Sequence, residues 1–152
     1  MDKAAERQVA VDLFNEVWRL MELEDRRPDE DDRMLHMAHA SRYHWGEVGT
    51  SVNRSRGEWQ VSRVYALLGR GGPALYHARR GLEICEANGT KDWDLAYAYE
   101  SLARAAAIAG DADASAAWLA RAEAATAEVE EEEDRELLLS DLATIPRADT
   151  ER

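Results

Sequence analysis

The sequence predicts an all-α fold in a single domain. The chain of 152 residues contains only three prolines and nine glycines, and strong helix formers fill the segments between them. Alternating apolar and polar runs bounded by turn residues, the pattern of strands, are absent. We expect one domain over 1–145 and a flexible tail over 146–152, since this length suits one domain of about 100–200 residues.

The helical period of the apolar residues delimits the elements. It predicts helices at 4–24, 30–48, 54–70, 73–88, 94–109, 112–128 and 131–143. Because the connections are short, consecutive helices are expected to pack as antiparallel hairpins.

Residues 1–50 hold the first two helices. Pro28 and Asp29 are typical of a helix start, since proline is tolerated in the first turn and an acid favours the N-terminal end. One stripe of the second helix is expected to face the core, and it consists of Met34, Ala38, Ser41, Trp45 and Val48.

Glycines and prolines bound the next hairpin. The Gly69–Pro73 segment predicts a tight turn with Pro73 as the first residue of the following helix, and Gly89 predicts its end. Cys85 lies on the apolar stripe of that helix, which indicates a small buried group rather than a reactive thiol.

The third hairpin and the last helix complete the chain. Asp92 or Asp94 is a candidate N-cap, and Gly110 with Asp111 predicts the turn between the two helices of the hairpin. The final helix begins within an acidic run over 128–134, which indicates a solvated junction.

The third hairpin carries an ordered series of large and small residues, namely Tyr99, Leu102, Ala103, Ala106, Gly110, Ser115, Leu119 and Ala122. This series resembles the tetratricopeptide repeat. Val61, Ser62, Tyr65 and Gly69 match it in the preceding hairpin, which continues either with Ala74 or, after a four-residue slip, with Ala78, Leu82 and Cys85. Gly69 and Gly110 are 41 residues apart, so the chain is more similar to the longer repeats of kinesin light chains, of about 42 residues, than to the usual repeat of about 34.

The resemblance implies an α-solenoid, a right-handed superhelix of about three antiparallel hairpins with a capping helix at 131–143. Residues 1–50 would be a degenerate first hairpin, followed by hairpins at 54–88 and 94–128. It also implies a non-catalytic interaction module with a concave groove, whose carried-over positions are Arg56, Trp59, Arg63, Tyr97, Glu100 and Arg104.

The groove lies in the basic part of an acidic protein. The chain has a net charge of −12, yet residues 54–91 hold seven basic residues against three acidic ones. Arginines beside aromatic rings suit an acidic peptide or protein partner. The alternative is that these arginines pair with acids of adjacent helices, and that Trp59 packs on the preceding hairpin.

The second helix also presents a histidine face. His36, His39, Tyr43 and Glu47 share one side, with His44 at its boundary. His36, His39 and His44 are therefore candidate ligands of a metal-binding protein or metal-dependent enzyme, which would need a carboxylate such as Asp12 or Glu16. The alternative is a hydrogen-bonding face packed on the first helix or on a dimer mate, and a purely structural homodimer is the third functional hypothesis.

Composition excludes several other classes. The acidic balance argues against nucleic-acid binding, and one cysteine excludes an internal disulfide and a thiolate zinc knuckle. No apolar run is long enough to cross a membrane, and the N-terminus lacks the apolar region of a secretory signal. We therefore expect a cytoplasmic protein that needs no cofactor.

Overall fold

A computed structural model describes residues 1–147, which form helices and no strand. The helices are α1 (Lys3–Met21), α2 (Pro28–Val48), α3 (Ser51–Leu67), α4 (Gly71–Asn88), α5 (Asp92–Ile108), α6 (Ala112–Ala127) and α7 (Glu132–Ala143). The all-α prediction is confirmed, and every predicted boundary lies within three residues of the observed one. Of the predicted tail at 146–152, residues 148–152 lie outside the described part of the chain.

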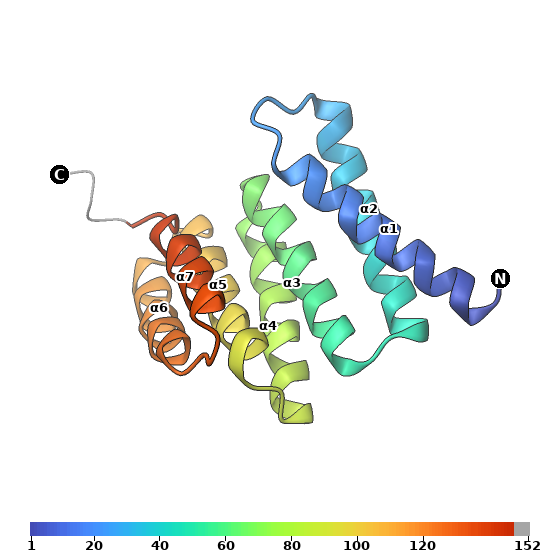
Figure 1. Ribbon diagram of the computed structural model, residues 1–152. Helices are drawn as coiled ribbons and strands as arrows, with labels where there is room; N and C mark the ends of the chain where they lie inside the picture. The colour runs from blue at the N-terminus through green and yellow to red at the C-terminus, as the bar shows by residue number, and fades with distance from the viewer. Residues whose placement is uncertain (148–152) are drawn as a thin grey trace.

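The helices pack in pairs that follow one another across the molecule (Figure 1). α1 packs on α2, α3 on α4, and α5 on α6, while α7 lies against α5 and α6. The first helix of each pair also contacts the first helix of the next, because α3 touches both α1 and α5, and α5 touches α7. The sides of α1, α3, α5 and α7 that meet in this way enclose the site described below.

Glycines allow the tight connections between the helices. Gly89 ends α4 in the left-handed region, with φ of 64°, as predicted from the sequence. At the start of α4, a Cβ on Gly71 would lie 2.5 Å from the Cα of Ala109. Only glycine allows the first turn of α4 to approach the end of α5 so closely.

Two predicted helix starts differ from the observed ones. α4 begins at Gly71, so Pro73 is its third residue rather than its first. Neither Asp92 nor Asp94 caps α5, whose N-cap is Lys91. The carboxylate of Asp92 instead accepts the backbone N–H of Glu130, and that of Asp94 binds an arginine of α3. Tertiary partners thus outcompete the local capping bond.

The hairpins α3–α4 and α5–α6 each contain a serine hydrogen bond that joins their two helices. Ser62 Oγ in α3 donates to the carbonyl of Ala74 in α4, at 2.8 Å, and Ser115 Oγ in α6 donates to the carbonyl of Ala103 in α5, at 2.9 Å. Each bond spans 12 residues, so Ala74 in one hairpin corresponds to Ser115 in the other. This equal spacing favours the alignment through Ala74 over the four-residue slip considered from the sequence.

The expected apolar stripes form the core. Met34, Ala38, Ser41 and Trp45 of α2 are buried, and Val48 is half-buried. Cys85 is buried in the cluster that joins α3, α4 and α5, where burial raises the pKa of its thiol. The prediction that Cys85 is a small buried group is confirmed.

Candidate functional site

A pocket of about 350 Å³ lies where α1, α3, α4, α5 and α7 meet. Its apolar lining is dominated by large side chains, namely Phe14, Trp18, Trp59, Trp93, Tyr97 and Leu137. The ring of Trp59 is central, since its centroid lies 5.5 Å from that of Trp18 and 5.6 Å from that of Tyr97. Trp59 therefore both packs on the preceding hairpin and faces the pocket, so the two readings of it are compatible.

The structure separates the six predicted groove residues into two groups. Arg56, Trp59, Arg63 and Tyr97 line the pocket, whereas Glu100 and Arg104 do not. The latter two are buried beneath α7. Their burial follows from the packing of α7 on α5, because α7 covers two positions that would be exposed in an open groove.

Among the lining residues that sequence reasoning did not identify are Trp18, Trp93, Asp94 and Asp141. Trp93 could have been found, because it precedes Tyr97 by four residues and so shares its face of α5. Trp18 and Asp141 come from α1 and α7, and no local pattern relates them to the central hairpins.

The arginines at the pocket are paired with carboxylates of the same chain. Arg56 binds Asp94 through two hydrogen bonds, at 2.8 Å from Nε and 3.1 Å from Nη2. Arg63 lies 3.5 Å from carboxylate oxygens of both Glu100 and Asp141. The sequence alternative, in which arginines pair with acids of adjacent helices, is therefore realised here, and the acidic partner stays a prediction.

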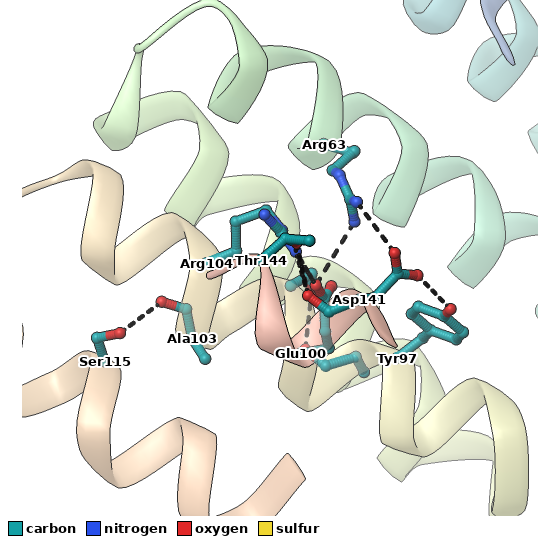
Figure 2. A network of polar contacts seen from close by, with 10 residues as sticks. Arg63, Tyr97, Glu100, Ala103, Arg104, Ser115, Asp141 and Thr144 are labelled. Carbon is teal, nitrogen blue, oxygen red and sulfur yellow. Dashed lines mark hydrogen bonds and ion pairs between the residues drawn. The ribbon is translucent and has the colours of Figure 1, made fainter. Parts of the chain in front are cut away.

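Figure 2 shows a polar network that includes three of the lining residues, Arg63, Tyr97 and Asp141. We call it the Glu100 cluster: Arg63, Tyr97, Glu100, Arg104, Asp141 and Thr144. The Glu100 side chain has no exposed area, and its Oε2 accepts two hydrogen bonds from Arg104, at 2.7 and 3.0 Å. Arg104 Nη2 also donates to the carbonyl of Asp141 and to Thr144 Oγ1, which lie at the C-terminal end of α7. A cation at this end of a helix satisfies its last carbonyls, so Arg104 ties α7 to α5.

Tyr97 adds a second tie to α7. Its hydroxyl donates to the carboxylate of Asp141. Burial, together with this hydrogen bond to a carboxylate, raises the pKa of Tyr97 far above its ordinary value. The phenol therefore stays protonated and remains a hydrogen-bond donor at any physiological pH.

Two of the lining residues carry donors without an acceptor. Trp59 Nε1 and Arg63 Nη1 are buried and have no hydrogen-bond partner among residues 1–147. Gln60 Oε1 and Glu100 Oε1 are likewise unpartnered in this part of the chain, but neither residue lines the pocket. Since buried polar groups are normally paired, the two donors mark the pocket wall as incomplete.

The histidine candidates of α2 do not converge. His36 is exposed, His39 Nε2 shares a hydrogen bond of 2.8 Å with the hydroxyl of Tyr65, and His44 Nδ1 lies 2.9 Å from Glu6. The carboxylates considered as further ligands are engaged elsewhere, by Gln8 and Arg19. Within residues 1–147, no group of three or more His, Cys, Asp or Glu side chains is arranged to hold a metal ion.

His39 instead belongs to a second network, which we call the Glu58 cluster: His39, Arg42, Glu58, Tyr65 and His77. Glu58 of α3 is buried, and each of its oxygens has a partner, His77 Nδ1 at 2.8 Å and Arg42 Nε. The rings of His39 and His77 lie 5.3 Å apart. Nothing in the sequence had related His77 to the histidines of α2.

Charge and burial shift two pKa values in this cluster. Burial, and then the neighbouring His77, lowers the pKa of His39. Burial alone would raise the pKa of Glu58, but hydrogen bonds from His77 and Arg42 outweigh it and lower that pKa. The cluster thus favours a neutral His39 beside an ionised Glu58.

A scan against protein-family models and searches of the curated proteins and of the solved structures found no match to this chain. None of the helices in the described part of the chain combines the length and apolar character needed to cross a membrane.

Proposed function

We propose that the chain is a non-catalytic interaction module of tetratricopeptide-like hairpins, and that it binds a peptide segment of a protein partner in the Trp59 pocket. The pocket itself carries the proposal. Tryptophan, tyrosine and arginine are the residues in which binding energy concentrates at protein interfaces, and all three line this cavity. Its volume of about 350 Å³ is near the lower end for ligand sites, which suits one anchoring side chain.

The common register of the two central hairpins supports the repeat assignment. The bonds of Ser62 to Ala74 and of Ser115 to Ala103 occupy corresponding places, as expected for two copies of one unit. The contacts of α1, α3, α5 and α7 in succession support the proposal of a solenoid whose first helices would face a concave side.

An acidic flank on the bound segment remains part of the proposal. Arg56 is half exposed, with 51% of its side chain accessible. Asp94 occupies Nε and Nη2 of this arginine, so a partner carboxylate would bind through Nη1. Because this pair is exposed, we expect the flank to contribute only about 0.2–1 kcal/mol and to govern the association rate more than the affinity.

Selection from a displayed peptide library on the purified protein tests the proposal. Peptides selected on the wild type should bind the Trp59→Ala variant at least about tenfold more weakly, a change of about 1.4 kcal/mol. Trp118→Ala is the matched control, because Trp118 stacks on Tyr99 away from the pocket. The proposal fails if no peptide is enriched, or if the enriched peptides bind both variants equally.

Light scattering at several protein concentrations separates this proposal from the homodimer hypothesis. A monomer that binds selected peptides supports the module. A dimer that dissociates in the Trp59→Ala variant, and that selects no peptide, would show that the pocket is filled by a second copy.

A further inference from the structure

The charges around the pocket cancel. Three arginines, Arg56, Arg63 and Arg104, are matched by three carboxylates, Asp94, Glu100 and Asp141. A carboxylate entering the pocket would leave this site with excess negative charge, and an ammonium group would leave it with excess positive charge. Charges that are buried without compensation are strongly disfavoured, so charge balance favours an uncharged occupant.

The buried polar atoms of the lining residues that have no hydrogen-bond partner within residues 1–147 are all donors. Trp59 Nε1 and Arg63 Nη1 are both N–H donors without an acceptor in the described chain. Arg63 Nη1 lies 3.5 Å from Glu100 Oε2, beyond the usual N–H···O range of about 2.7–3.2 Å. The guanidinium also lies over the Trp59 ring, with Cζ 5.7 Å from its centroid, so the two donors belong to one part of the wall.

The remaining wall is apolar and aromatic. Trp93 lies 4.7 Å from Tyr97 between ring centroids, and Trp18 lies 5.5 Å from Trp59. Such walls accept a flat or branched apolar group through stacked and edge-to-face contacts. Both nitrogens are buried in the wall, so an acceptor oxygen adjacent to that group would reach them as the side chains that cover them move aside.

We infer that the pocket takes an uncharged anchor, an apolar side chain whose adjoining amide carbonyl accepts hydrogen bonds from Arg63 and Trp59. This inference rests on the proposed function and defines the chemistry of the segment that the module binds. An acidic residue of that segment would then lie outside the pocket, near the exposed Arg56, rather than within it.

Three matched derivatives of phenylalanine test the inference: N-acetyl-phenylalaninamide is neutral, N-acetyl-phenylalanine is an anion, and phenylalaninamide is a cation. Each is titrated into ¹⁵N-labelled protein, and the indole N–H resonances of the tryptophans are followed. We expect the neutral amide to bind at least about tenfold more tightly than either charged probe. The resonance of Trp59, assigned with a Trp59→Phe variant, should shift to the frequency of a hydrogen-bonded indole.

Substitution of the donor provides the second measurement. Arg63→Lys keeps the charge but loses the planar fork, and we expect it to weaken binding of the neutral amide about tenfold. Arg80→Lys is the control, because Arg80 pairs with Glu83 outside the pocket, and it should leave binding unchanged. If Arg63→Lys does not fold, Trp59→Phe serves instead, and it should weaken the amide because it removes the other donor.

The inference is overturned if the anion or the cation binds as tightly as the neutral amide, or if no probe shifts the Trp59 resonance. This result can be told apart from a failure of the proposed function, which is peptide binding at the Trp59 pocket. Selected peptides that depend on Trp59 but carry a charged anchor would remove the inference and leave the module intact.

Discussion

Two buried glutamates, Glu58 in α3 and Glu100 in α5, each belong to a polar network that joins three helices, yet their surroundings differ. Both oxygens of Glu58 are paired, one with His77 of α4 and the other with Arg42 of α2. Glu100 concentrates its contacts on Oε2, which faces Arg104 and Arg63, while Oε1 has no hydrogen-bond partner within residues 1–147. The Glu58 cluster is complete, whereas the Glu100 cluster is not.

The difference bears on which cluster the proposed binding would involve. A network whose members are all satisfied fixes the packing of its helices and leaves little capacity for a ligand. The Glu100 cluster borders a pocket, and its Arg63 has an unfilled donor. The Glu58 cluster contains His39, whose pKa burial and His77 lower, whereas none of the residues that define the Glu100 cluster is a histidine.

The largest expected effect is that of Glu100→Ala. This change leaves Arg63 and Arg104 without their shared carboxylate in a buried place, and breaking such a pair costs about 3–5 kcal/mol. Urea unfolding should show this loss in the free energy of unfolding. Glu83→Ala, which removes an exposed partner of Arg80, is the control and should stay within about 0.5 kcal/mol of the wild type. A loss below about 1 kcal/mol would mean that the Glu100 cluster contributes little to the fold.

A smaller effect is expected for Glu58→Gln. The amide keeps the shape of the side chain, and its N–H₂ group can donate to His77 Nδ1 in the other tautomer, but the carboxylate charge that strengthens the hydrogen bond from Arg42 is lost. We expect the free energy of unfolding to fall by about 1–3 kcal/mol, with no change in peptide binding at the Trp59 pocket. Impaired binding in a folded variant would contradict the division of roles between the two clusters.

The smallest effect concerns pH and distinguishes the clusters by their cations. The pKa of His39 is lowered from its ordinary 6.5 in the folded protein, so between the two values the unfolded chain binds more protons and stability falls as pH falls. Glu58, Tyr65, His77 and His36 surround this ring. The lowered pKa of Glu58 adds a further loss below its ordinary value of 4.5.

Melting curves at pH 7.5 and 5.5 measure the effect. Because His39 is partly exposed, we expect the loss of Tm between these pH values to be only about 1–3 °C smaller in His39→Gln than in the wild type. His36 makes no hydrogen bond in the cluster and exerts the smallest of these effects on the pKa of His39, so His36→Gln is the comparison and should change the loss of Tm by less than His39→Gln does. Equal losses in all three proteins would contradict the assigned role of His39.

Much of the fold could be predicted because its signals are local. The helical period placed each helix, and Gly89 and Pro28 marked an end and a start that the structure confirms. The caps predicted at Asp92 and Asp94 were wrong, because these carboxylates find partners about 38 residues away. A local rule cannot weigh a short-range hydrogen bond against a distant one.

The candidate site was only partly predictable. Arg56, Trp59, Arg63 and Tyr97 were identified as groove positions, and the structure brings them to one pocket. Glu100 and Arg104 were placed in the same groove, but α7 covers them. Trp18, Asp141 and His77 could not be identified, since their proximity depends on how separate hairpins pack.

The sequence by itself determined the helices, their order and the apolar faces they bury, since hydrophobic period, glycine and proline act over a few residues. Tertiary structure alone decided that α7 closes over α5, that the arginines of the basic region find internal carboxylates, and that Trp59 and Arg63 keep donors unfilled. Those outcomes depend on distances between residues far apart in the chain, where burial makes each charge and each N–H seek whichever partner the packed helices bring near.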